Sequence, residues 1–282
     1  MESSVLGTMY DVMDASWVAH DRAVCDIVLS KNHVVKTLFD QKKQRFVSLS
    51  AASFDTEDTD LLSATLEQMV AKDENFPRRW FVAAPKTMLV PDALYEPKIE
   101  QELFENHQVL EEGDILASHP VARIAGRMIF ALGDLFTSLL KNSNLKIDSF
   151  LPIDAAWLDG LYLNHKTTEA TNIHLNLSDG FVSIAVFSKG QMQFYNTFLT
   201  ITPEEVLYYL MFVSEQLGLN PLQDSYYYSG YIRKGDETAA LLGKYVKNLR
   251  PEERPAQYSY CMPILDVPGH LFYNSFTTPV CE

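Results

Sequence analysis

The sequence predicts an α/β protein built from two similar domains. Each half of the chain begins with three short, apolar, β-branched runs separated by polar turn residues, and a helix with an N-terminal cap follows. Shifting the chain against itself by 148 positions gives five identities over the eighteen positions 29–46, where average composition gives about one. With 282 residues, 47% of them hydrophobic, the chain has enough apolar material for two cores.

The first half mixes strands and helices. Short β-branched runs bounded by turn residues predict strands, and leucines at helical spacing behind a capping residue predict helices. The predicted strands span Val24–Ser30, Val34–Phe39, Arg45–Ala51, Trp80–Ala84, Thr87–Val90, Asp114–Ser118, Arg127–Leu132 and Ser149–Ile153. The predicted helices lie between Thr59 and Phe76, over Lys98–Asn106, and from Asp134 toward Asn144.

The second half repeats this order after Asn164–Thr171, a polar stretch without an apolar period. A capping box at Thr202 predicts a helix that ends at Gly218, and Asp236 begins another helix. The predicted strands span Asn172–Asn176, Val182–Phe187, Gln191–Thr197, Ser225–Tyr231 and part of Tyr258–Leu265. The polar stretch divides the chain into a first domain, residues 1–163, and a second domain, residues 164–282.

Charge and composition exclude several kinds of protein. With 23 Lys+Arg against 37 Asp+Glu, the net charge of -14 excludes a generic nucleic-acid binder, and a partner with a charge preference should be basic. No apolar run approaches the roughly 20 residues of a membrane span, so we expect no membrane insertion. Cys25, Cys261 and Cys281 lack a close spacing, which favours a reducing compartment and predicts a cytoplasmic protein.

Sequence patterns for catalysis and metal binding are absent. The chain contains no phosphate-binding loop, dinucleotide fingerprint, nucleophile elbow or zinc-protease pattern. Its seven histidines lack the short spacings that bring metal ligands together, and His174, on a predicted strand, is expected to have a hydrogen-bonded structural role. We therefore expect no catalytic residue and no metal ligand.

Short motifs carry a resemblance to a known family. They are Cys25-Asp-Ile-Val-Leu-Ser30, Phe81-Val-Ala-Ala-Pro85 with Leu89-Val-Pro91, and Ile173-His-Leu-Asn-Leu-Ser178. Over about residues 20–265 the chain resembles an uncharacterised family of actin-like proteins from Bacteroides-type bacteria. Its two halves are also similar to the actin-like ATPase superfamily of actin, the Hsp70 chaperones and sugar kinases. The resemblance implies an actin-like ATPase fold, with two duplicated ribonuclease-H-like domains around a cleft.

The resemblance also implies where a nucleotide would bind. In that superfamily two hairpin turns present backbone N–H groups to the phosphates, since a concave group of amides binds anions, and a glycine-containing turn contacts the adenosine. The implied cofactor-binding candidates are Ser30, Lys31, Asn32, Ser178, Asp179, Gly180, Ser229 and Gly230. Ordinary tight turns are the alternative explanation for Asp179-Gly180 and Ser229-Gly230.

The two aspartates that hold magnesium in the superfamily are missing. Counting back from Val34 and Val182 places Val28 and Asn176 at their positions. Valine cannot coordinate a cation, and a neutral amide is a poor substitute for a carboxylate on Mg²⁺. The nucleotide site is therefore expected to be degenerate.

Phosphoryl transfer depends on positioning and charge neutralisation, so the missing carboxylates predict a protein without this activity. We expect a non-catalytic intracellular scaffold or protein-binding module that needs no cofactor and whose partner is another protein. The first alternative is an ATPase or phosphotransferase with a relocated metal site, which uses Asp26 or Asp179 for the metal and the Ser30 and Ser178 turns for phosphate. The second is an α/β binder of a small metabolite without actin kinship.

Overall fold

The first of the three sheets has seven strands. The structure, a computed structural model, describes residues 6–20, 22–54, 58–71, 73, 75–142, 144–232 and 235–281. Six strands follow the order β1 (Leu6–Met13), β4 (Arg45–Phe54), β3 (His33–Asp40), β2 (Ala23–Leu29), β5 (Arg78–Val82) and β9 (Phe150–Pro152). The two-residue strand β15 (Ser259–Tyr260) pairs with β4. Strand β1 was not predicted.

The second sheet has five strands and the same connectivity. Its order is β12 (Gln191–Leu199), β11 (Phe181–Ser188), β10 (Asn172–Ser178), β13 (Ser225–Gly230) and β14 (Leu249–Pro251). In both sheets three consecutive strands form an antiparallel meander. A later strand pairs in parallel with the first strand of that meander, and one more strand pairs in parallel with that later strand. The predicted α/β fold is confirmed, and the two main sheets have the same strand connectivity.

The internal repeat extends to the strand register. Leu29 pairs with Val34 in the first hairpin, and Leu177 pairs with Val182 in the second, which is the same pairing 148 residues later. Across the parallel neighbours, Leu29 is opposite Val82 and Leu177 is opposite Gly230, again 148 residues apart. The two hairpin turns that follow Leu29 and Leu177 therefore occupy equivalent positions in the two sheets.

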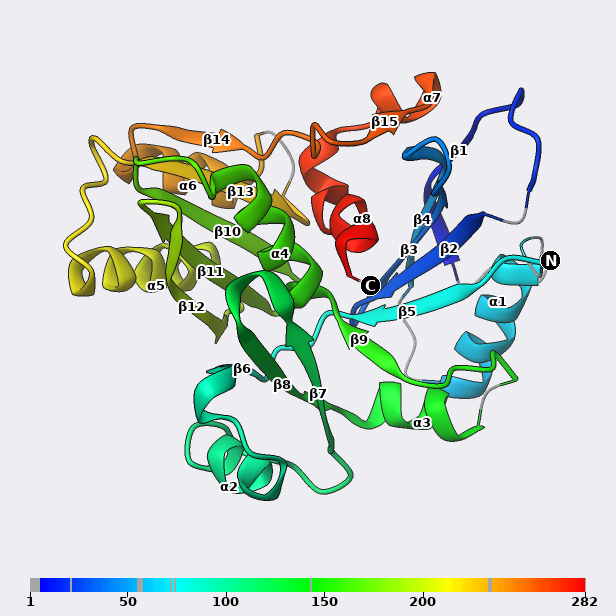
Figure 1. Ribbon diagram of the computed structural model, residues 1–282, viewed down its shortest axis with the longest axis horizontal. Helices are drawn as coiled ribbons and strands as arrows, with labels where there is room; N and C mark the ends of the chain where they lie inside the picture. The colour runs from blue at the N-terminus through cyan, green and yellow to red at the C-terminus, as the bar shows by residue number, and fades with distance from the viewer. Residues whose placement is uncertain are drawn as a thin grey trace.

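Helices cover the outer faces and fill the space between the two sheets (Figure 1). Two helices begin where caps predict them: Thr202 and Glu205 form both hydrogen bonds of a capping box, and Asp236 caps the next helix. The α-helices are α1 (Thr59–Ala71), α2 (Glu100–Glu105), α3 (Asp134–Asn142), α4 (Ile153–His165), α5 (Pro203–Gln216), α6 (Glu237–Tyr245), α7 (Met262–Leu265) and α8 (Tyr273–Thr277). None of the helices described is long and apolar enough to cross a membrane.

A small third sheet is inserted between β5 and α3. Its order is β6 (Thr87–Pro91), β8 (Gly126–Leu132) and β7 (Ile115–Val121), with the 3₁₀ helix η3 (Ala122–Ile124) between β7 and β8. This sheet and α2 form a separate lobe beside α4 (Figure 1). Each of its strands was predicted, but their pairing into a separate sheet was not.

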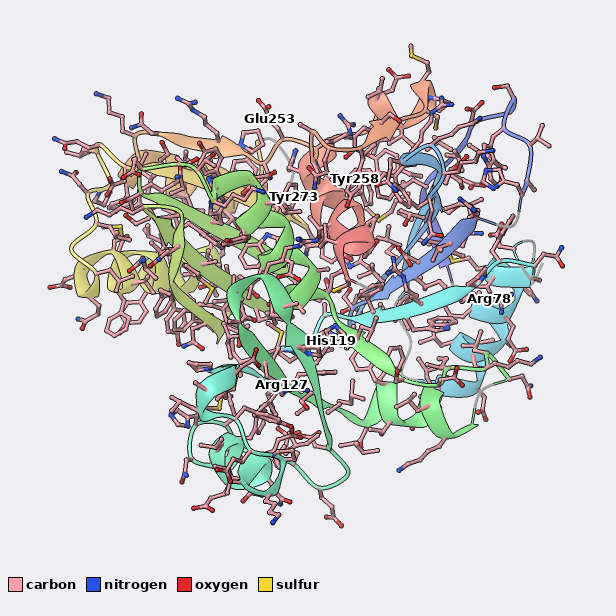
Figure 2. The ribbon with its side chains drawn as sticks, viewed as in Figure 1. Arg78, His119, Arg127, Glu253, Tyr258 and Tyr273 are labelled. Carbon is pink, nitrogen blue, oxygen red and sulfur yellow. The ribbon has the colours of Figure 1, made fainter. Side chains whose placement is uncertain are left out.

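Helix α4 lies between the two main sheets beside α8, and neither helix was predicted. All nine residues of Ile153–Leu161 are buried, so the helix lacks the polar face that makes a helical period visible. At its end, Asn164 donates a hydrogen bond to the hydroxyl of the fully buried Tyr273 (3.0 Å). Figure 2 labels Tyr273, which belongs to α8. The predicted domain boundary at residues 163 and 164 falls in the last turn of α4 and stays a prediction.

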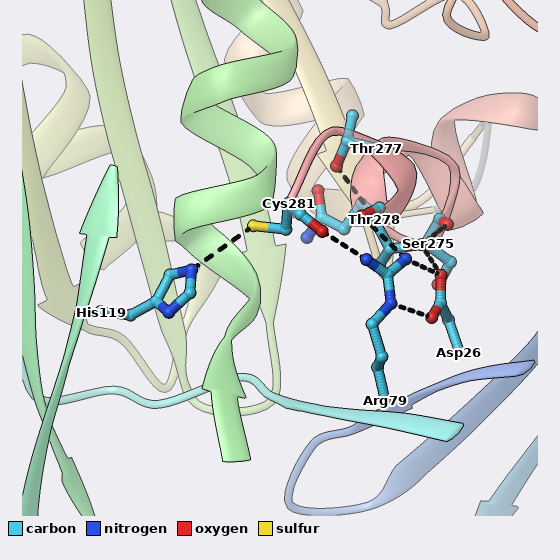
Figure 3. Close-up of polar contacts among 8 residues, drawn as sticks. Asp26, Arg79, His119, Ser275, Thr277, Thr278 and Cys281 are labelled. Atoms are coloured by element: carbon cyan, nitrogen blue, oxygen red, sulfur yellow. Dashed lines mark hydrogen bonds and ion pairs between the residues drawn. The ribbon is translucent and has the colours of Figure 1, made fainter. Parts of the chain in front are cut away.

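The chain returns to the first sheet after β14. The sequence predicted a strand within Tyr258–Leu265, and the structure has the short β15 followed by α7. The last described residues approach Arg79 of β5, whose guanidinium donates to the carbonyl oxygens of Thr278 (3.1 Å) and Cys281. The C-terminal segment therefore ties the second sheet back to the first (Figure 3).

Candidate functional site

The two hairpin turns that the resemblance assigned to the nucleotide phosphates lie in contact with each other. The turn between β2 and β3 contributes Ser30 and Asn32, and the turn between β10 and β11 contributes Asp179. Each turn follows the equivalent strand of its sheet, and the way the two sheets pack against each other brings the two turns into contact. The structure thus brings together three of the eight candidate residues.

The Asp179 carboxylate accepts every hydrogen bond that joins the two turns. Ser30 Oγ donates to its Oδ2 at 2.5 Å, and the backbone N–H of Asn32 donates to the same oxygen at 2.9 Å. The Nδ1 atom of His33 lies 3.0 Å from Oδ1 and 2.9 Å from Oδ2. An N–H and a hydroxyl at a hairpin turn are the groups that would bind a phosphate oxygen, and here they bind a carboxylate of the same chain.

Electrostatics favour the ionised form of Asp179. Burial acts to raise its pKa, but the hydrogen bonds from His33, Ser30 and the Asn32 N–H outweigh burial and hold the pKa below its ordinary value. The side chain of Asp179 is 14% exposed and that of His33 is 20% exposed, so solvent screens this contact only partly. The carboxylate is therefore a stable internal anion at neutral pH.

An aromatic pair adjoins this contact. The ring of Tyr231 stacks on that of His33 with centroids 4.0 Å apart and planes 22° from parallel. The Tyr231 N–H donates to the Leu177 carbonyl at the end of β10 (2.9 Å), and burial raises the pKa of its hydroxyl. Neither His33 nor Tyr231 was singled out as a site residue, although each directly follows a predicted turn.

The turn expected to contact adenosine is packed against the neighbouring strand. Ser229 is fully buried, and its hydroxyl faces the Leu175 carbonyl at 3.4 Å. Gly230 has a φ of +87°, and a Cβ at this position would lie 1.9 Å from the Leu177 carbonyl oxygen. The close approach of two backbones therefore explains this glycine without a ligand.

The remaining candidates make no contact with the Asp179 carboxylate. Lys31 is exposed at the tip of its turn, and Ser178 pairs through its backbone with Phe181. Gly180 has a φ of +83° with no atom within 4 Å of an added Cβ, as in a tight hairpin turn. These three residues form the turns without contributing to the contact between them.

Neither magnesium position carries a carboxylate that faces the turns. Val28 is buried in the core between the sheets. Asn176 is buried, and its Nδ2 lies 3.4 Å from a carboxylate oxygen of Asp154 in α4. The residues described contain no group of three or more His, Cys, Asp or Glu side chains that could hold a metal ion.

Asp154 is a buried carboxyl that the sequence analysis missed together with α4. Ser183 Oγ donates to its Oδ2 at 2.5 Å and the Tyr195 hydroxyl at 2.7 Å. Burial raises the pKa of Asp154 and outweighs the opposing hydrogen bonds from Ser183, Tyr195 and Asn176. An acidic residue directly after the predicted strand Ser149–Ile153 was the signal available in the sequence.

Asp26, the other candidate for a relocated metal ligand, is paired in the interior. Arg79 donates to its two carboxylate oxygens through Nε and a terminal nitrogen, both at 2.7 Å, and Thr278 Oγ1 donates at 2.6 Å (Figure 3). The Asp26 side chain is fully buried. A bidentate arginine and a hydroxyl occupy the lone pairs that a cation would need.

Two further predictions concern side chains outside the hairpin turns. His174 is fully buried, and its Nδ1 forms a hydrogen bond with Glu252, as the predicted structural role requires. The three cysteines are free and buried. Burial raises the pKa of Cys25 and of Cys281 to about 12, so neither thiol is a nucleophile at neutral pH.

Comparison with known proteins bears on both the fold and the family. A family model described as "Protein of unknown function (DUF3822)" matches residues 26–249. A Bacteroides thetaiotaomicron protein with an actin-like ATPase fold and unknown function superposes with a TM-score of 0.74 at 16% identity, over 93% of this chain and 97% of that chain. No protein with a curated description matches the sequence.

Two other solved structures share the fold. PilM, in the PilM-PilN type IV pilus biogenesis complex, gives a TM-score of 0.64 at 13% identity, over 92% of this chain and 98% of that chain. The ethanolamine utilization protein EutJ from Carboxydothermus hydrogenoformans gives 0.51 at 9% identity, over 96% and 93% of the two chains. The chain therefore has an actin-like ATPase fold, as its resemblance implied.

Proposed function

The chain belongs to the DUF3822 family of unknown function, and we propose that it is a non-catalytic protein-binding module that uses the actin-like fold without a nucleotide. The observation that carries this proposal is the Asp179 carboxylate, which accepts the hydrogen bonds of Ser30 and Asn32 that a phosphate would need. A nucleotide phosphate entering this place would have to displace an ionised carboxylate and would meet its negative charge.

The residues around the turns do not fit a magnesium nucleotide. Val28 and Asn176 supply no carboxylate for the metal, and Asp26 is already bonded to Arg79 and Thr278. Phosphoryl transfer draws its rate from positioning and charge neutralisation, so a site without these groups lacks the main source of catalysis. These contacts also weigh against the alternative of an ATPase with a relocated metal.

Binding of another protein is a function of this fold that a structural relative supports. PilM, which shares the fold, is found in a complex with PilN, and by analogy we propose that this chain also acts by binding another protein. Its three buried, free cysteines are in keeping with the reducing environment of the cytoplasm, where we propose that the protein acts.

Isothermal titration calorimetry with Mg-ATP, together with a phosphate-release assay, tests the proposal. We expect no saturable heat up to low-millimolar Mg-ATP and no release of phosphate above the buffer rate. A tagged full-length chain should retain a specific protein from a lysate of its native organism, and the retention should be unchanged by Mg-ATP or EDTA. Micromolar affinity for Mg-ATP with turnover that is lost in Asp179→Ala would overturn the proposal in favour of the enzyme.

A further inference from the structure

A hollow with three cationic side chains lies where the inserted lobe meets the second domain. It has a volume of about 540 Å³, and it is lined by Arg123 of η3, Lys166 at the end of α4 and Lys189 in the turn between β11 and β12. Figure 1 shows α4 between the inserted strands β7 and β8 and the second sheet. This hollow contains none of the residues of the two turns that meet at Asp179.

Backbone contacts hold the three cations around α4. The Arg123 N–H donates to the buried Asp159 carboxylate of α4 at 3.1 Å. The N–H of Gly190, next to Lys189, donates to the Thr168 carbonyl at 3.0 Å. Gly190 has a φ of +72°, and an added Cβ would lie 2.5 Å from the Lys166 carbonyl oxygen. The turn therefore packs directly on the end of the helix, which fixes the backbones that carry the two lysines.

The three cations have no carboxylate within ion-pair distance in the part of the chain that the structure describes. Asp159 accepts the Arg123 N–H and also interacts electrostatically with the Arg123 guanidinium, whereas Glu169 is exposed on the segment that follows α4. Like charges held together repel each other, and this chain has 37 acidic residues that could have neutralised them. Two exposed lysines that form no ion pair among the described residues, next to Arg123 in a chain of net charge -14, favour an anionic partner at this hollow.

The hollow also has an apolar lining. Ile124, Tyr162 and Met192 line it, and all three are partly buried against the core between the two main sheets. A small inorganic anion would not contact the exposed parts of these three apolar side chains. A peptide with an apolar side chain between acidic residues would contact both the apolar lining and the cationic rim.

From this combination we propose that the hollow is the docking site for an acidic segment of a partner protein, in which carboxylates flank an apolar side chain. The inference rests on the proposed function, because it supplies the surface through which a protein-binding module would act. The carboxylates pair with Arg123, Lys166 and Lys189, and the apolar side chain packs on Tyr162 and Met192. The overall negative charge of the chain disfavours acidic peptides elsewhere on its surface, so this local cluster would determine where the segment binds.

Fluorescence polarisation with a labelled octapeptide of glutamate pairs separated by leucine tests this site, and the same peptide with glutamine in place of glutamate is the neutral comparison. We expect the acidic peptide to bind at low salt, to weaken as salt rises, and to bind at least ten-fold more weakly to the double variant Lys166→Glu/Lys189→Glu. The matched control is Lys141→Glu/Lys244→Glu, which changes the net charge equally at two exposed lysines outside the hollow. Circular dichroism checks that all variants are folded.

Several results would overturn the inference. They are equal affinity for the acidic and neutral peptides, no binding to the wild-type chain, or equal loss in the control variant. Competition by millimolar inorganic phosphate at constant ionic strength would indicate a small-anion site instead. Each of these outcomes is independent of the Mg-ATP titration, so the docking site can fail while the proposed function stands.

Discussion

At the scale of single residues, Asp179 is the side chain on which the site depends. It is the acceptor for Ser30, Asn32 and His33, which belong to the first main sheet and its hairpin turn, whereas Asp179 belongs to the second. A hydrogen bond to a charged group contributes about 1.5–3 kcal/mol, and a donor left unpaired in the interior costs about as much again. The contact is therefore a substantial link between the two domains.

Asp179→Ala should lower the free energy of unfolding by about 2 kcal/mol at neutral pH, because it removes charge-assisted hydrogen bonds. The pKa of Asp179 is lowered below its ordinary value of 3.8, so the native state binds fewer protons than the unfolded state in that range. The stability that ionised Asp179 contributes is present above pH about 4 and is lost as the pH falls through the native pKa. Urea unfolding at pH 5.5 and pH 3 should therefore show a smaller difference between wild type and variant at pH 3.

The exposed Asp148 provides the control, since Asp148→Ala removes the same charge without a buried contact and should change stability by less than about 0.5 kcal/mol. Equal effects of the two substitutions would contradict the role given to Asp179.

The sequence predicted the residue types of this site better than its contacts. The absence of carboxylates at positions 28 and 176 follows from counting along two hairpins, which is local information. The contact of Asp179 with Ser30 and Asn32 joins residues about 150 positions apart, and it depends on how the two domains meet. No periodicity or motif in the sequence predicts that the two hairpin turns lie in contact.

At the scale of secondary-structure elements, the parallel pairing of β13 with β10 places the turn that was expected to contact adenosine directly against the backbone of β10. Gly230 permits this packing, since its backbone has a positive φ and lies directly against the Leu177 carbonyl. Gly180 also has a positive φ, but an added Cβ there meets no atom within 4 Å. A substitution at Gly180 therefore tests backbone strain alone, whereas a substitution at Gly230 tests backbone strain together with a close contact.

Gly230→Ala should destabilise the protein by about 4 kcal/mol or prevent folding, because overpacking adds to the left-handed strain. Gly180→Ala should cost about 1 kcal/mol from the strain alone. Thermal unfolding of both variants measures the difference. Similar losses in the two variants would mean that the contact with Leu177 is not tight and that the turn has room for a ligand.

Elements whose signals are local were predictable, and buried ones were not. Helix α5 has its capping box and one apolar face in the sequence, and the structure confirms it. Helix α4 is buried on all sides over Ile153–Leu161, which hides its period. Helix α4 carries Asp154, and also Asp159 and Tyr162 beside the cationic hollow. These residues were missed as site residues because the helix that carries them was missed.

At the scale of the whole molecule, Arg79 is one of the residues that join the C-terminal segment to the first sheet. Arg79 bonds to the fully buried Asp26 and to two carbonyl groups of residues 278 and 281. Removing one partner of a buried ion pair leaves an uncompensated charge, which costs about 3–5 kcal/mol. This pairing explains why the acidic residue of the first predicted strand is structural.

Arg79→Ala should lower the free energy of unfolding by about 3 kcal/mol and should speed amide exchange over residues 273–281. The neighbouring Arg78 donates only to the Val70 carbonyl, so Arg78→Ala should cost about 1 kcal/mol and leave that exchange unchanged. Hydrogen exchange detected by mass spectrometry reports both variants. Unchanged exchange over 273–281 in Arg79→Ala would show that the segment is held by other contacts.

The central claim, that an internal carboxylate takes the place of phosphate between the two domains, is tested most directly by a ¹³C NMR titration of the Asp179 carboxyl carbon, assigned with Asp179→Asn, with and without millimolar Mg-ATP. We predict a pKa below 3.8 and a resonance that Mg-ATP does not shift. A pKa at or above 3.8, or a saturable shift on adding Mg-ATP, would contradict the account.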